Sequence, residues 1–122
     1  MYRQDWIVLQ IEMLAQFIAR VIFKKDTIKY QVADQNSLTE EDMLYYEIEK
    51  LLAQSNICAA EDLLYKRINR NCNKYLELAI DFYQKLNTFS DEVLEAADFP
   101  RDEIHSGLIE IMQIFGLPKM SS

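Results

Sequence analysis

The sequence predicts an all-α protein, folded as one compact bundle of about five to six helices. Half of the 122 residues are apolar, which suits one domain with its own core. The chain holds only two glycines and two prolines, whereas all-β folds need many turns. Apolar residues also recur at helical spacing along most of the chain. We therefore expect a single helical domain over residues 1–118 and a disordered tail at 119–122.

Residues 5–25 predict a first helix of about 20 residues. At 100° per residue, one broad face is apolar and a polar strip lies opposite. The apolar face consists of Ile7, Ile11, Leu14, Phe17, Ile18, Val21 and Ile22. The polar strip consists of Asp5, Glu12, Gln16, Arg20 and Lys24. Polar residues within this stretch argue against both a signal peptide and a membrane span.

Three large residues of this helix, Trp6, Leu9 and Met13, form a row outside the core face. A monomer has little reason to expose such a row. Two explanations stay open at this point. Either the C-terminal helix or the 26–37 connector covers the row, or it packs against a partner, most simply in a two-fold dimer of antiparallel first helices.

Residues 26–37 predict an extended connector. Ile28, Tyr30 and Val32 alternate with polar residues, so their side should lie on the core. No partner strand is evident, and a sheet is therefore not expected. Ser37 or Thr39 can then cap a second helix.

Five further helices follow the connector. The second has an acidic first turn and an apolar stripe of Leu44, Ile48, Leu51 and Leu52. A third starts near Ile57, and a polar turn at 69–74 separates it from a fourth. Ser90 caps a short helix through Ala97, and Pro100 can open the last one. That last helix carries Ile104, Leu108, Ile111, Met112 and Phe115, and ends at Gly116.

The segment "LLAQSNICAAEDLL" is similar to the turn of a tetratricopeptide (TPR) hairpin, with Ala60 as the small residue at the helix crossing. Tyr75 follows Leu44 by 31 residues rather than 34, so only about one and a half TPR-like units are expected. An ordinary helical hairpin is the alternative.

The chain also resembles a family of small bacterial proteins of unknown function. The resemblance covers residues 2 to about 117 and rests on "YRQDWIVLQIEMLAQFIA", "LAIDFY" and the closing "IFGL". It implies a TPR-like helical fold. It implies no activity, substrate or catalytic residue.

The net charge of −7 argues against nucleic acid or an anionic membrane as the main partner. It suits a cytoplasmic protein. Cys58 and Cys72, the only cysteines, show no metal or disulfide pattern and are expected to be reduced, partly buried thiols. No cofactor or metal is expected.

Two local clusters are candidates for chemistry. Asp102 and Glu103 precede the single histidine, His105, but no second histidine or nucleophile motif accompanies them. A packing or exposed histidine is the simpler interpretation. Four cations surround the 69–74 turn and could hold a phosphate or an acidic peptide: Lys66, Arg67, Arg70 and Lys74. They could equally neutralise a helix end.

We therefore expect a non-enzymatic helical interaction module, TPR-like and homodimeric, with another protein as a further possible partner. The predicted interface is Trp6, Leu9 and Met13. The alternative is a small-molecule binder or an enzyme with a polar pocket between helices, using His105 or the basic turn.

Overall fold

The computed structural model describes residues 2–118, and their side chains from Trp6 onward. The predicted tail at 119–122 lies outside the described residues. Within this range the chain is all-α, with no strand. The helices are α1 (Tyr2–Ile18), which continues into the π-helix η1 (Ala19–Phe23), then α2 (Glu40–Ala53), α3 (Ile57–Arg67), α4 (Asn73–Asn87), α5 (Asp91–Ala96) and α6 (Arg101–Ile114).

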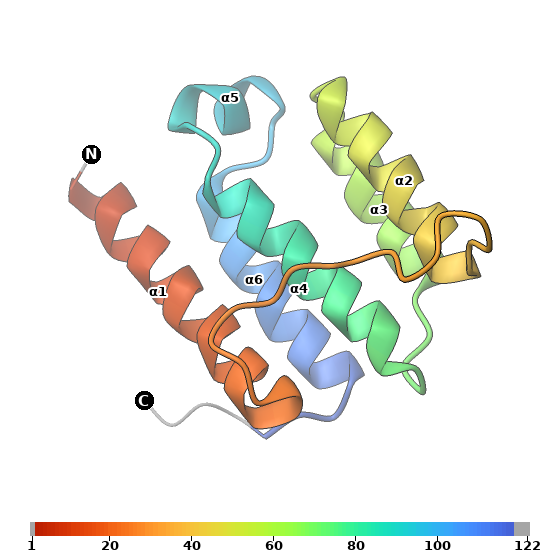
Figure 1. The fold of residues 1–122 in the computed structure, drawn as a ribbon. Helices are drawn as coiled ribbons and strands as arrows, with labels where there is room; N and C mark the ends of the chain where they lie inside the picture. Colours follow the sequence, from red (N-terminus) through yellow and green to blue (C-terminus); the bar gives the residue numbers. More distant parts are fainter. Residues whose placement is uncertain (1, 119–122) are drawn as a thin grey trace.

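The helices form two groups that meet at α4 (Figure 1). On one side, α1, α4 and α6 pack against one another. On the other side, α2 and α3 form a hairpin that packs on α4. The short α5 lies at one end, between α4 and α6. The connector from η1 to α2 crosses α4, and so ties the two groups together.

The predicted core face of the first helix is confirmed. Ile11, Leu14 and Ile18 are buried, and Ile7 and Phe17 are half-buried against them. The helix is not uniform, however, because its last five residues form a π-helical turn. Lys24 ends it in the left-handed conformation, with a φ of 58°, and the backbone N–H of Lys25 donates to Ala19 O at 3.2 Å.

The connector packs as predicted, with Ile28 and Tyr30 buried and Val32 half-buried. Tyr30 anchors it at two points. Its hydroxyl donates to Asp42 Oδ1 of α2 at 2.6 Å, and its backbone N–H donates to Asp81 Oδ1 of α4 at 3.2 Å. The phenol hydrogen bond lowers the pKa of Asp42, although burial opposes that effect. The connector is therefore fixed to both α2 and α4.

The predicted helix ends are largely confirmed. Thr39 caps α2, and its hydroxyl accepts from the N–H of Asp42 while Asp42 accepts from the N–H of Thr39. Ser90 caps α5. Pro100 precedes α6 as its N-cap instead of occupying the first helical position. Gly116 follows α6 with a φ of +63°, which favours glycine.

A second polar network joins α3, α4 and α6. Tyr83 donates its hydroxyl hydrogen to Glu61 at 2.5 Å, and the hydroxyls of Tyr83 and Tyr65 lie 3.1 Å apart. Tyr65 in turn lies 3.4 Å from the carbonyl oxygen of Gly107. Burial raises the pKa of Glu61, and it raises that of Tyr65 to about 12. All three side chains therefore hold their protons more tightly than they would in water, since the pKa of buried Tyr83 is raised as well.

Candidate functional site: the outward side of α1 and its groove

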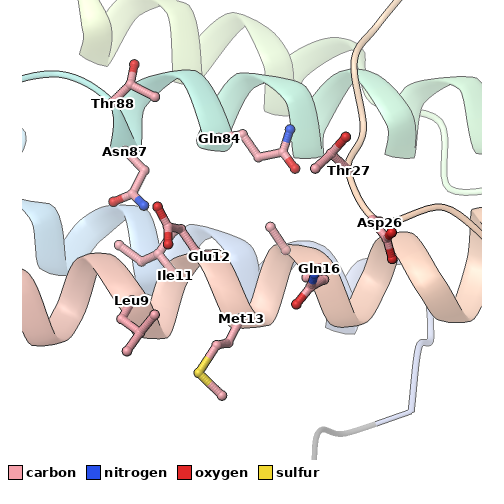
Figure 2. A pocket seen from close by; sticks show the side chains of 11 residues that line it. Leu9, Ile11, Glu12, Met13, Gln16, Asp26, Thr27, Gln84, Asn87 and Thr88 are labelled. Carbon is pink, nitrogen blue, oxygen red and sulfur yellow. The ribbon is translucent and has the colours of Figure 1, made fainter.

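A groove of about 400 Å³ runs beside α1, between that helix, the start of the connector and the end of α4 (Figure 2). Residues from three separate segments line it. From α1 come Leu9, Ile11, Glu12, Met13, Ala15 and Gln16; from the connector come Asp26 and Thr27; from α4 and its C-cap come Gln84, Asn87 and Thr88. The groove thus has both apolar and polar residues on the α1 side and polar residues along the other two walls.

Hydrogen bonds hold the walls of the groove in place. The Asn87 side-chain amide donates to the carbonyl oxygen of Val8 at 3.1 Å, which ties the end of α4 to α1. Gln84 donates to the carbonyl oxygen of Ile28, which ties the connector to α4. Buried Arg101 donates to the backbone oxygen of Asn87 at 2.9 Å and to its side-chain oxygen at 3.1 Å. The groove is therefore part of the packed structure.

The charges in the groove are few. Asp26 pairs with Arg20 at 3.1 Å, and both side chains are exposed. Glu12 is the other lining carboxylate, and it is exposed on α1. None of the described residues that line this groove is a histidine or a cysteine. Amide and hydroxyl groups on Gln16, Gln84 and Thr27 could donate or accept hydrogen bonds to a visiting polar group.

The three predicted interface residues lie on the outward side of α1. Trp6 is 64 % exposed, Leu9 55 % and Met13 46 %. Leu9 and Met13 also line the groove, so the row and the groove are continuous (Figure 2). Within the described residues neither α6 nor the connector buries the row, since all three of its side chains are exposed. Of the two explanations, burial by the chain itself is therefore wrong for this structure.

The stretch Trp6–Phe23 is, between Tyr2 and Pro118, the one helical segment long and apolar enough to cross a membrane, with a mean hydropathy of 1.6. Only 28 % of it is buried. Core helices and signal sequences share this length and composition, so the finding is weak evidence for a membrane span. Part of the apolar surface of this stretch faces outward, because the stretch includes the exposed residues Trp6, Leu9 and Met13.

One protein-family model matches residues 1–116, which is nearly the whole chain. The chain belongs to DUF6483, a family of unknown function. No curated protein and no solved structure matches it. The DUF6483 match covers every helix of the fold and both the row and the groove. It confirms the resemblance to an uncharacterised family.

The predicted basic turn is not a single cluster in this DUF6483 chain. Arg67 lies 3.8 Å from Glu47 of α2, while Lys66 and Arg70 are exposed. Lys74 faces the other way and donates to the carbonyl oxygen of Gln31 in the connector at 3.2 Å. The structure thus separates Lys74 from the other three cations.

The remaining candidates are dispersed as well. His105 is half-buried on α6, and Asp102 and Glu103 are exposed. Among residues 2–118, no three histidines, cysteines or carboxylates are placed so that they could hold a metal ion. Cys72 is half-buried as expected, but Cys58 is exposed, because its position on α3 faces outward beside the carbonyl oxygens of Ala97 and Asp98.

Sequence reasoning missed the α4 side of the groove. In the sequence, Gln84 and Asn87 are simply polar residues of a predicted helix. The carbonyl groups to which their side chains donate belong to residues 56 and 79 positions away. One signal was present in the sequence. Asp81 and Asn87 fall among the apolar residues of α4, and a polar residue at a core position normally has a hydrogen-bond partner.

Proposed function

We propose that this chain is a non-enzymatic helical interaction module that forms a homodimer through the outward side of α1. The observation that carries the proposal is the row of Trp6, Leu9 and Met13, three large side chains about half exposed or more on one helix. Burying each of them against a partner would gain roughly 1.5–3 kcal/mol before the costs of association. Aromatic residues and methionine are also enriched in protein interfaces.

The spacing of the row favours a second copy of the same chain as the partner. Trp6, Leu9 and Met13 are followed by Gln16 and Arg20, in the alternating three- and four-residue steps of a coiled-coil seam. Two such helices related by a two-fold axis place the same short apolar row on both sides of one interface. The polar Gln16 and Arg20 limit the apolar part of the seam to its first half.

The groove extends the same surface. A stable interface buries on the order of 1,200–2,000 Å² in total, more than three side chains on each subunit provide. Because Leu9 and Met13 also line the groove, a helix seated on the row would reach the polar wall at Asn87 and Thr88. The exposed Thr88 hydroxyl offers a hydrogen bond at the rim, where interfaces are polar.

The α2–α3 hairpin supports the TPR-like part of the proposal. Ala60 is fully buried where the two helices pack together, and Leu44, Ile57 and Leu64 are buried around it. A small residue surrounded by larger apolar ones is the pattern that a TPR hairpin uses. We propose that this hairpin is the scaffold that holds α4, and through α4 the α1 surface, in place.

The test is the mass of the protein in solution, measured by light scattering over a range of concentrations. The wild type should have twice the chain mass of 14.4 kDa, and Met13→Glu should have the single mass while keeping its helical circular dichroism. Met43→Glu is the matched control, because Met43 is 49 % exposed on α2, outside the α1 surface. It should leave the dimer intact. A monomeric wild type at all concentrations would overturn the proposal.

A further inference from the structure

A second groove lies on the opposite side of the connector, toward the start of α4. It has a volume of about 610 Å³ and a mostly polar lining. Three lysines line it: Lys25 and Lys29 from the connector and Lys74 from the first turn of α4. Thr27, Gln31 and Glu77 contribute further polar groups. Its volume falls in the range of roughly 300–1,000 Å³ that is usual for small-molecule sites.

The backbone that presents these lysines is anchored. Ile28 and Tyr30 point into the core, so Lys29 and Gln31, the alternate residues of an extended segment, face outward. The two hydrogen bonds of Tyr30 to Asp42 and Asp81 fix this part of the connector against α2 and α4. A site on such a fixed segment loses little conformational freedom when a ligand binds.

The third lysine is held in place by its surroundings. Lys74 Nζ donates to the Gln31 carbonyl oxygen at 3.2 Å and lies 4.6 Å from the centre of the Tyr30 ring. It also pairs with Glu77 at 3.4 Å. Among the described residues Glu77 is the only carboxylate in the lining, and Lys74 already offsets its charge.

The other two lysines supply the unbalanced charge. No carboxylate of the described residues lies within ion-pair distance of Lys25 or Lys29, and both side chains are exposed. The groove is therefore positive, although the whole chain carries a net charge of −7. A positive concave surface on an acidic protein attracts small anions more effectively than it attracts large ones, which the rest of the surface repels.

We propose that this groove binds a small anion that carries a phosphoryl group. Lys25 and Lys29 contact the phosphoryl oxygens, and the Thr27 hydroxyl completes the site. A phosphoryl group presents several charged oxygens at once, which several ammonium groups can share. This site is independent of the α1 dimer and goes beyond the proposed interaction function.

The test is calorimetric titration of the whole protein with inorganic pyrophosphate. The wild type should bind it, and Lys29→Glu should weaken binding about tenfold or more, because it removes one charge-assisted contact and adds a repulsive charge. Lys50→Glu is the matched control, since Lys50 is an exposed lysine in the last turn of α2, outside the groove. It should change affinity by less than about twofold, because salt largely screens an exposed charge that lies outside the site. Lys25→Glu provides a second variant should Lys29→Glu fail to fold.

A second arm separates the two sources of a phosphoryl group. Sedimentation with vesicles of phosphatidylcholine, with and without phosphatidic acid, tests a lipid headgroup. Binding of pyrophosphate that depends on Lys29 assigns the groove to a free phosphate compound. Binding of the phosphatidic-acid vesicles alone, lost in Lys29→Glu but kept in Lys50→Glu, assigns it to a headgroup. Binding of neither probe, or equal losses in both variants, would overturn the proposal.

Discussion

The ring of Tyr83 occupies the space beside Gly107 that a β-carbon would need. A β-carbon built on Gly107 would lie 2.4 Å from the Cζ and hydroxyl oxygen of Tyr83. Tyr83 is fully buried and bonded to Glu61, so its ring cannot move aside freely. The close packing of α4 on α6 therefore depends on a glycine in the middle of a helix.

Gly107→Ala should destabilise the protein by about 1–3 kcal/mol, the usual cost of overpacking, even though alanine favours helix. Urea unfolding would measure the change. Ser106→Ala, at the exposed neighbouring position, should shift stability by less than about 0.5 kcal/mol. In a Tyr83→Leu background the cost of Gly107→Ala should shrink, because the clashing atoms are gone. Equal costs in both backgrounds would contradict this account.

The pH dependence of stability should show the effect of the raised pKa of Glu61. Burial raises the pKa of this carboxyl above its ordinary value of 4.5, while the Tyr83 hydrogen bond opposes the shift. A carboxyl with a raised folded-state pKa contributes stability below its unfolded pKa, and loses it as the pH rises through the folded pKa. The stability of the wild type relative to Glu61→Gln should therefore fall as the pH rises above about 4.5 and then level off.

Urea unfolding at a series of pH values would measure this difference. Asp62→Asn is the control, because Asp62 is the next residue of α3 and is exposed. If the two variants gave the same curve relative to wild type, the buried position of Glu61 would not be the cause.

Tyr30→Phe should loosen the connector. The variant loses the hydroxyl that donates to buried Asp42, which costs about 1–3 kcal/mol. Hydrogen exchange and limited proteolysis should both increase within residues 26–37. Tyr46→Phe removes a hydroxyl that bonds to Gln35 at the surface, at 3.2 Å, and should change neither.

The same variant has a pH signature of opposite sign. The Tyr30 hydrogen bond lowers the pKa of Asp42 below 3.8, so its stabilisation is present above that pH and is lost as the pH falls through the folded pKa. The stability gap between wild type and Tyr30→Phe should narrow in acid. A gap that is constant from neutral pH to well below 3.8 would contradict the assignment.

Arg101→Lys should destabilise the protein by about 1–3 kcal/mol, although it keeps the charge. The planar guanidinium of Arg101 donates hydrogen bonds to the backbone oxygen of Asn87, to the carbonyl oxygen of Phe89 at 2.7 Å and to Asp91 at 2.9 Å. A single ammonium cannot reach all of them. Arg67→Lys, at an exposed ion pair with Glu47, should be nearly neutral. Thermal unfolding would compare the two; similar losses would mean that the fork geometry is unimportant.

The helices were predictable because their signals are local. Apolar residues at helical spacing marked α1, α2 and α6, and the capping residues Thr39 and Ser90 marked two helix starts. The π-helical turn at the end of α1 was not predictable, since its residues alone predict that the α-helix continues. It depends on how Lys24 redirects the chain into the connector.

The polar interior was harder to predict, because the hydrogen-bond partners of its side chains lie on other segments of the chain. Asp42 looked like an ordinary first-turn acid, yet it is buried because Tyr30 supplies its partner. Asp81 is shared between the Tyr30 backbone and Lys85 of the next turn. Such roles depend on which segments meet in space. The cytoplasmic location, the dimer and the lack of a nucleic-acid partner stay predictions.

The packing of α1 has a consequence for the order in which the protein can be assembled on the ribosome. The ribosome synthesises α1 before α4 and α6, the helices against which it packs. At about 5–20 residues per second, the nascent chain exposes the inner side of α1 for several seconds. The α2–α3 hairpin can form during this interval, whereas α1 must wait for the C-terminal half. Truncated chains that lack α6 should accordingly depend on chaperones more strongly than the full chain does.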